Sequence, residues 1–411
     1  MEKQNKLVTK IIITVGILFI ARMGVFIPIP GIDNQGFNES LTDNKIISFL
    51  NVFSGGGFST IGIFSLGIIP YINSSIITQL LVKIVPQLEE IQKNEGETGK
   101  QKIVKITRYF TLIWAIIQSI SISLWIQPYA FNQNKHFIID SVLTLTTGSM
   151  IILWFSEVIT EYGIGNGSSL IIFQNIISNV PKNINKYEIN TPSNLPIIIL
   201  IISLCISILV GNIIIQDSKR KINIVSSKEL GNLTNLKKQN YIPLKLNQGG
   251  VMPIVFASAT ISLPQYFIYS GNSKNQLFSN IFKLTINNNI IYLLLYSILI
   301  VAFSYFYSSI ILNPEDIAEN LQKMGASIPN IRPGKETIEY LRNTINKLTF
   351  IGSIFLFIIA QLPFIISKTT QINVLQGLGT TSLLILVGVA IDTAKQIQTY
   401  IISEQYDSMM E

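Results

Sequence analysis

Residues Phe53 to Val85 read FSGGGFSTIGIFSLGIIPYINSSIITQLLVKIV, and this stretch decides the fold. Roughly its first dozen residues are rich in glycine and serine, and an apolar half long enough to cross most of a bilayer follows. Each of Gly55, Gly56 and Gly57 lowers helix stability by about 1 kcal/mol relative to alanine. Irregular backbone cannot face lipid, because its unpaired N–H and C=O groups find no water there. The broken segment therefore belongs inside protein or beside water, which indicates a pore or a transport path.

The composition of the whole chain indicates a polytopic membrane protein. Its 411 residues are 48% hydrophobic and only 13% charged, with a mean hydropathy of +0.45. The single cysteine, Cys205, excludes a disulfide framework and a cysteine-based metal site, and the single histidine, His136, is expected in a solvated polar link. We find no Ser/His/Asp set, no metal-ligand spacing and no carboxylate pair suited to acid–base catalysis. The sequence predicts a protein that is not an enzyme and holds no cofactor.

Ten apolar runs predict ten membrane-spanning helices. They cover approximately residues 7–27, 66–85, 106–127, 138–158, 165–181, 195–216, 249–269, 290–312, 347–367 and 376–397. An even number of spans places both termini on one side of the membrane. If that side is cytoplasmic, or stromal in a plastid, its loops carry most of the 30 Lys and Arg residues, as the positive-inside rule requires.

Two of the loops on the inner side, residues 217–247 and 313–347, are long and basic. Ordinary orientation charge, with some contact to anionic lipid, would explain them. Docking of a soluble partner that presents acidic groups or RNA phosphate would also explain them. The run Ile331-Arg332-Pro333-Gly334 favours docking, because an extended residue before proline and a glycine after it are typical of a structured tip.

Several long motifs resemble the SecY family, whose members are the protein-conducting channel subunits of the Sec translocon. Besides FSGGGFSTIGIFSLGIIPYINSSIITQLL, the resemblance rests on RMGVFIPIPG from Arg22, ITEYGIGNGSSLIIF from Ile159, PLKLNQGGVMPIVFAS from Pro243, NPEDIAENLQKMGASIPNIRPG from Asn313 and GTTSLLILVGVAIDT from Gly379. The motifs occur in family order and touch nearly every span, so the resemblance covers essentially the whole chain. Heavy use of isoleucine, asparagine and lysine makes the chain similar to a plastid-encoded member.

The resemblance implies an all-α fold of two inverted five-helix halves around an hourglass pore that opens sideways between the second and seventh spans. The N-terminal half is residues 1–181, the C-terminal half is residues 195–397, and a C-terminal tail occupies residues 398–411. The broken second segment implies a plug at about residues 54–65. Its weakly held glycines and serines suit an element that must leave and return, whereas a plain loop before an ordinary span is the simpler alternative.

The resemblance also assigns roles to individual residues. An apolar pore ring is expected from Ile72, Ile76, Ile172, Val255 and Ile385, with a sixth position at Ser168 where the family is usually apolar. The plug is expected to include Ser54, Gly55, Gly56, Gly57, Thr60 and Ser65. Docking of a motor is expected at Arg332, Lys335, Lys219, Arg220, Lys221 and Lys245. Polar contacts at the lateral gate are expected from Gln118 and Ser258. Any one of the isoleucines could instead face lipid or simply fill a helix contact.

The function that the resemblance implies is translocation of unfolded polypeptides across and laterally into a membrane. The expected partners are the motor ATPase SecA, a small SecE-like clamp subunit, a SecG-like subunit, signal-bearing precursors, the ribosome and membrane lipids. The expected location is the plastid thylakoid membrane, with the bacterial plasma membrane as the alternative. A rival function is ion-coupled secondary transport, although such transporters usually need an ionisable group in mid-membrane. An insertase or scaffold without a pore is compatible with the hydropathy alone.

Overall fold

The computed structural model describes residues 2–33, 61–94, 96–131, 135–185, 195–226, 240–250, 252–254, 256–257, 260, 289–370 and 380–410. The chain divides into two compact units. Unit 1 comprises Met1–Pro196, Ala259–Asn287 and Ile366–Glu411, and unit 2 comprises Ile197–Ser258 and Asn288–Ile365.

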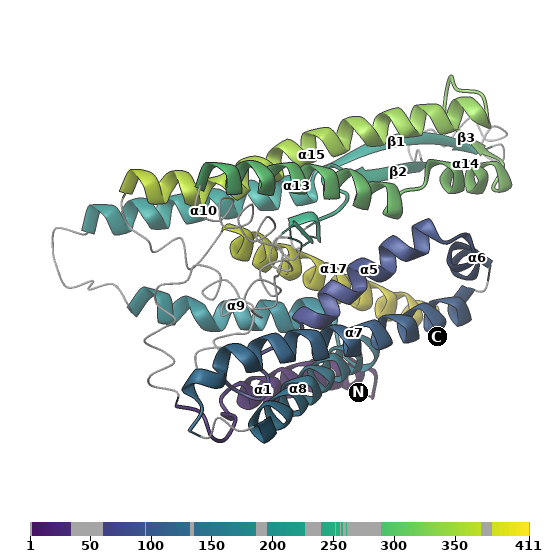
Figure 1. The fold of residues 1–411 in the computed structure, drawn as a ribbon. Helices are drawn as coiled ribbons and strands as arrows, with labels where there is room; N and C mark the ends of the chain where they lie inside the picture. Colours follow the sequence, from purple (N-terminus) through teal and green to yellow (C-terminus); the bar gives the residue numbers. More distant parts are fainter. Residues whose placement is uncertain are drawn as a thin grey trace. The chain divides into compact units, whose positions relative to one another are not determined.

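Unit 1 is built from packed helices (Figure 1). They are α1 (Glu2–Val25), α5 (Ile69–Ile84), α6 (Pro86–Asn94), α7 (Gly96–Ile126), the 3₁₀ turn η1 (Gln127–Tyr129), α8 (Lys135–Tyr162), α9 (Gly167–Asn185) and α17 (Thr380–Met410). Helix α7 packs between α5 and α8, while α9 packs against α1, α8 and α17. The unit is therefore a helical layer in which α8 and α9 link the N-terminal helix to the C-terminal one.

Small hydroxyl side chains hold α7 against α8. The buried face of α7 includes Thr111, Ala115 and Ser119, which recur every four residues and let the helices approach closely. The Ser119 and Thr146 hydroxyl oxygens lie 3.0 Å apart, and the Ser141 hydroxyl donates to that of Ser123 at 2.8 Å. Hydrogen bonds of this kind join helices in apolar surroundings, where hydrophobic driving force between them is weak.

The segment that leads into α5 is fixed by close backbone contacts. The Ile29 N–H donates to the Ile61 carbonyl at 3.0 Å, and the Ile63 N–H donates to the Ile27 carbonyl at 2.9 Å. A side chain at Gly62 would collide with the Val25 carbonyl, and one at Gly148 on α8 would collide with the Ile63 carbonyl. Glycine is therefore required at both positions, because the segment lies between the end of α1 and the middle of α8.

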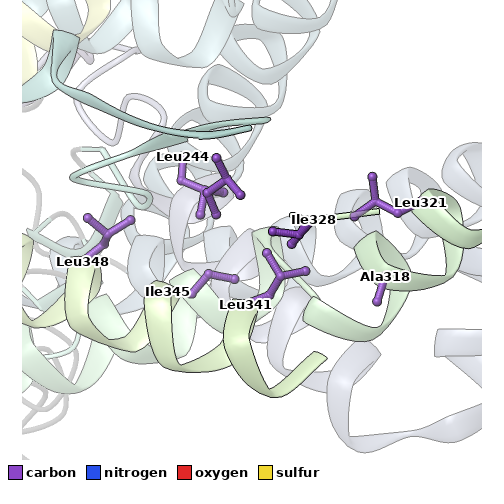
Figure 2. Close-up of a cluster of buried hydrophobic side chains, with 8 residues drawn as sticks. Leu244, Ala318, Leu321, Ile328, Leu341, Ile345 and Leu348 are labelled. Carbon is purple, nitrogen blue, oxygen red and sulfur yellow. The ribbon is translucent and has the colours of Figure 1, made fainter. Parts of the chain in front are cut away.

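Unit 2 combines long helices with a small α/β module. The long helices are α10 (Leu195–Asp217), α13 (Asn289–Ile311) and α15 (Lys335–Thr370), and the module adds β1 (Lys219–Ser226), β2 (Asn240–Lys245), α14 (Pro314–Lys323) and β3 (Ala326–Ser327). The strand order is β2-β1-β3, with antiparallel pairing throughout. Figure 2 shows the module's apolar core, in which Leu244 of β2, Leu321 of α14 and Leu341 of α15 are all buried.

Among the described residues, a helix covers every predicted span except 249–269, most of which lies outside them. Within the same residues, four stretches are long and apolar enough to cross a membrane: Leu7–Val25, Gly96–Tyr129, His136–Tyr162 and Leu293–Lys323. The fold class expected from sequence is confirmed. The β-hairpin of β1 and β2 is an addition, because the sequence indicated only a basic loop at 217–247.

Candidate functional site

The residues expected to form the pore ring are buried wherever the structure describes them. Ile72 and Ile76 on α5, Ile172 on α9 and Ile385 on α17 are each less than a tenth exposed, whereas Val255 lies outside the described residues. The four isoleucines share unit 1, and α9 packs directly on α17. Their burial argues against a lipid-facing role, because other isoleucines on the apolar helices, such as Ile113 on α7, are half exposed. Convergence of the five residues around one pore stays a prediction.

Ser168, the uncertain sixth ring position, is engaged in the cap of α9. Its hydroxyl donates to Asn166 Oδ1 at 2.7 Å, and its backbone N–H donates to the same oxygen at 3.1 Å. An asparagine that accepts from the first free N–H groups of a helix is a typical N-cap. The polar side chain at 168 is therefore explained by the start of the helix, one turn before Ile172.

The predicted plug lies almost entirely outside the described residues: Ser54, Gly55, Gly56, Gly57 and Thr60 cannot be placed. Ser65 is buried, and its hydroxyl has no partner among the described residues. Ile61 adopts a left-handed backbone with φ of 42° while its side chain is almost fully buried. This conformation is unfavourable for a β-branched residue and persists only where the surrounding packing enforces it.

Gln118, the predicted lateral-gate residue on α7, is completely buried, and Ser258 lies outside the described residues. Neither the oxygen nor the nitrogen of the Gln118 amide has a hydrogen-bond partner within the described part of the chain. The amide of Asn73 on α5, a residue that the sequence did not single out, is also buried and also has no hydrogen-bond partner within the described part of the chain. A buried amide without partners costs about 1–3 kcal/mol, so both positions suit polar contacts that form in another state of the molecule.

The residues expected to dock a motor fall into two groups on the module of unit 2. Arg332 and Lys335 are exposed at the tip that precedes α15. Two hydrogen bonds order this tip: the Arg332 N–H donates to Glu336 Oε2 at 3.3 Å, and Thr337 Oγ1 donates to the Arg332 carbonyl at 2.8 Å.

The other group lies at the base of the hairpin. Lys219, Arg220, Lys221 and Lys245 are all exposed there. The far end of β1 pairs with β3 through Val225 and Ser327, and the six steps along the strand from Lys219 to Val225 span about 20 Å. The two basic groups are therefore separate surfaces.

Arg108 on α7 and Glu157 on α8 form an ion pair of 2.7 Å. The sequence did not indicate that these two residues form a pair. The spacing of 49 residues along the chain gives no local signal for the pair. Within the described residues, no group of three or more His, Cys, Asp or Glu side chains could hold a metal ion.

Comparison with known proteins identifies the family. The family model described as SecY matches residues 62–394. The chain belongs to the SecY family. The protein translocase subunit SecY of Pyropia yezoensis is 57% identical over 411 residues, with 100% of each chain covered. That of Synechocystis sp. is 47% identical over 415 residues, with 98% of this chain and 94% of the relative covered.

A solved structure described as that of a protein-conducting channel also shares the fold. Its TM-score is 0.68 at 17% sequence identity, and the match covers 97% of this chain and 94% of the other. The SecY fold thus extends over nearly the whole chain, including the hairpin module that the sequence analysis did not foresee.

Proposed function

We propose that this chain forms the polypeptide-conducting pore of a Sec-type protein translocase and that it also opens sideways to release apolar segments into lipid. The observation that carries the proposal is the 57% identity over 411 residues to the protein translocase subunit SecY of Pyropia yezoensis. The burial of Ile72, Ile76, Ile172 and Ile385 supports it further.

The pore ring closes and opens by simple physical chemistry. Branched aliphatic side chains exclude water when they meet, and a dry constriction blocks ions. Such side chains make no directional bonds, so they part around a polypeptide of any sequence. We assign the pore ring to the five predicted residues and the plug to residues 54–65. The plug is rich in glycine and serine, so it buries little apolar surface and can be displaced at a low cost in free energy.

We assign motor docking to the ordered tip that carries Arg332 and Lys335. A SecA-type ATPase is the proposed motor, with the ribosome as a second driving partner. A SecE-like subunit clamps the two halves from the lipid side, and a SecG-like subunit joins them. A signal sequence, itself an apolar helix, wedges into the lateral gate and contacts Gln118 and Ser258. Its binding separates the second and seventh spans and frees the plug.

The proposed location is the plastid thylakoid membrane, with both termini in the stroma. The support is the isoleucine-, asparagine- and lysine-rich composition together with relatives from the alga Pyropia yezoensis and the cyanobacterium Synechocystis. A bacterial plasma membrane is the alternative, and the codon table and neighbouring genes distinguish the two.

Ion-coupled transport is less compatible with the charges of the helices. A coupling ion needs an ionisable group that is available in mid-membrane. Glu157 is instead paired with Arg108 at 2.7 Å, so each charge compensates the other.

Reconstitution tests the proposed function. The chain would be placed in liposomes with its small partner subunit and a motor ATPase, and protease protection of a precursor would be measured. We expect ATP-dependent uptake of a signal-bearing precursor and no uptake of the same precursor without its signal. Uptake of a small solute by the chain alone, without precursor movement, would contradict the proposal.

A further inference from the structure

We propose that the base of the β1–β2 hairpin binds anionic lipid headgroups of the membrane that the chain spans. The site consists of three residues, Lys219, Lys221 and Lys245, which we call the basal lysines. The resemblance assigns these three lysines to motor docking, and the present proposal gives them to lipid instead, while docking at Arg332 and Lys335 is unaffected.

The register of the hairpin places the basal lysines on one face. Side chains alternate along a strand, and directly paired residues share a face. Arg220 pairs with Leu244, and Ile222 pairs with Ile242. Ile222 and Leu244 are buried in the module's core, so this face turns inward. Lys219 pairs with Lys245, and Lys221 pairs with Pro243, so the basal lysines share the opposite, exposed face.

The pairing of Lys219 with Lys245 is unfavourable without a ligand. Like charges directly opposite each other destabilise an antiparallel sheet. No salt bridge joins either lysine to an acidic side chain among the described residues, whereas Lys323 and Arg342 elsewhere in the module each have one. An anion between the two ammonium groups would remove the repulsion and bind both.

The position of the basal lysines indicates which anion. Helix α10 is an almost wholly apolar run that ends at Asp217, and Lys219 begins β1 two residues later. At about 3.3 Å per residue, Lys219 lies about 7 Å past the end of α10, within a Debye length, and Lys221 lies about 13 Å past it. Lysines at this depth attract the phosphate or sulfonate of acidic lipids. The Lys221 ammonium also lies over the ring of Tyr241, 4.7 Å from its centroid, and tyrosine is typical of membrane interfaces.

A soluble motor is a poorer occupant of this face. The ordered tip with Arg332 and Lys335 lies at the opposite end of the module, about 20 Å away by the length of α15 from Lys335 to Leu348. Arg220 is exposed but lies on the other face of the hairpin, with Ile222, so it is not one of the basal lysines. The basic residues of the two loops therefore serve two partners, with lipid at the base and a soluble partner at the tip.

Photolabelling tests the proposal. The full chain with its small partner subunit would be placed in nanodiscs that contain phosphatidylglycerol with a photoreactive headgroup, and labelled peptides would be found by mass spectrometry. We expect labelling of residues 219–226 and 240–248. The variant Lys219→Gln/Lys245→Gln should lower it by about fivefold for each charge removed.

Two variants serve as controls. Lys219→Arg/Lys245→Arg keeps both charges and should keep the labelling. Arg332→Gln/Lys335→Gln removes the same charge at the tip and should also leave the labelling unchanged. Equal labelling by photoreactive phosphatidylcholine would overturn the proposal. So would a Lys219→Gln/Lys245→Gln variant that keeps its lipid labelling but loses binding of the motor or of ribosomes, because the lysines would then serve a soluble partner.

Discussion

At the scale of single residues, the proposed pore ring predicts that one polar side chain in place of a buried isoleucine destabilises the closed pore. Ile76 lies on α5 one turn after Ile72, and both are buried. We expect Ile76→Asn to raise export of a precursor with a defective signal by about tenfold, because an unpaired amide in a dry constriction destabilises the closed state by about 1–3 kcal/mol. The measurement is protease-protected precursor in proteoliposomes, and Ile385→Asn should behave alike.

The control for this prediction is Ile76→Val, which keeps a branched apolar side chain and should keep signal selectivity. An Ile76→Asn channel that still rejects the defective signal would show that Ile76 fills a helix contact and not a pore.

At Gln118 the reverse substitution, from a polar to an apolar side chain, tests the proposed lateral gate. Replacing its unpartnered amide by leucine removes a buried polar group, so Gln118→Leu should stabilise the closed state by about 1–3 kcal/mol. We expect a higher melting temperature of the detergent-solubilised complex and slower export. Unchanged export at raised stability would mean that Gln118 has no part in opening.

The ring candidates come from the resemblance to the SecY family, and the spacing of four adds only that Ile72 and Ile76 share one helix face. It could not identify Asn73 or the strained backbone of Ile61, since both depend on contacts between segments that are distant in the chain. The cap at Asn166 explains Ser168 only once the start of α9 is known.

At the scale of elements, the tip before α15 should act as a docking surface that is separable from folding. We expect Arg332→Glu to abolish export while the complex assembles normally, because a reversed charge repels an acidic partner surface. Motor binding and precursor uptake would be measured on the same preparation. Arg342→Glu is the matched control: it reverses an exposed charge on α15, the helix that follows the tip, where Arg342 is paired with Glu315 at 3.3 Å. Normal export by Arg332→Glu would refute docking at the tip.

The apolar core of the α/β module should keep the tip before α15 in the conformation that binds the motor. Leu341 is completely buried between the sheet and α14, so Leu341→Ala should destabilise the module by about 2–5 kcal/mol. Limited proteolysis of the hairpin and of the 324–334 segment should then accelerate, and motor binding should fall. A variant with unchanged protease resistance would show that the helices alone hold the tip.

Hydropathy located the helices well but not their ends. Helices α7, α15 and α17 continue beyond their predicted spans at residues 96–105, 335–346 and 398–410, where the sequence is polar. The backbone N–H and C=O groups of a helix are paired with each other in water as well as in lipid. A helix can therefore continue past the membrane surface, where its side chains become polar and hydropathy no longer detects it. The hairpin was not predicted because its apolar positions, Ile222, Ile242 and Leu244, are too few to indicate a strand without their partners on α15.

At the scale of the whole molecule, the charge distribution predicts which way the chain faces. Loops rich in lysine and arginine stay on the side of synthesis, so we expect the hairpin module and both termini on that side. In a Cys205→Ser background, a cysteine at Ser403 should react with a membrane-impermeant maleimide from the stromal or cytoplasmic side only, and one at Asn190 from the opposite side only. Equal labelling of both from one side would mean an even number of spans between residues 190 and 403, which would contradict a second half of five helices. Because the basal lysines follow α10 and residue 190 precedes it, the side from which residue 190 reacts also decides which leaflet, and so which lipids, can reach these lysines.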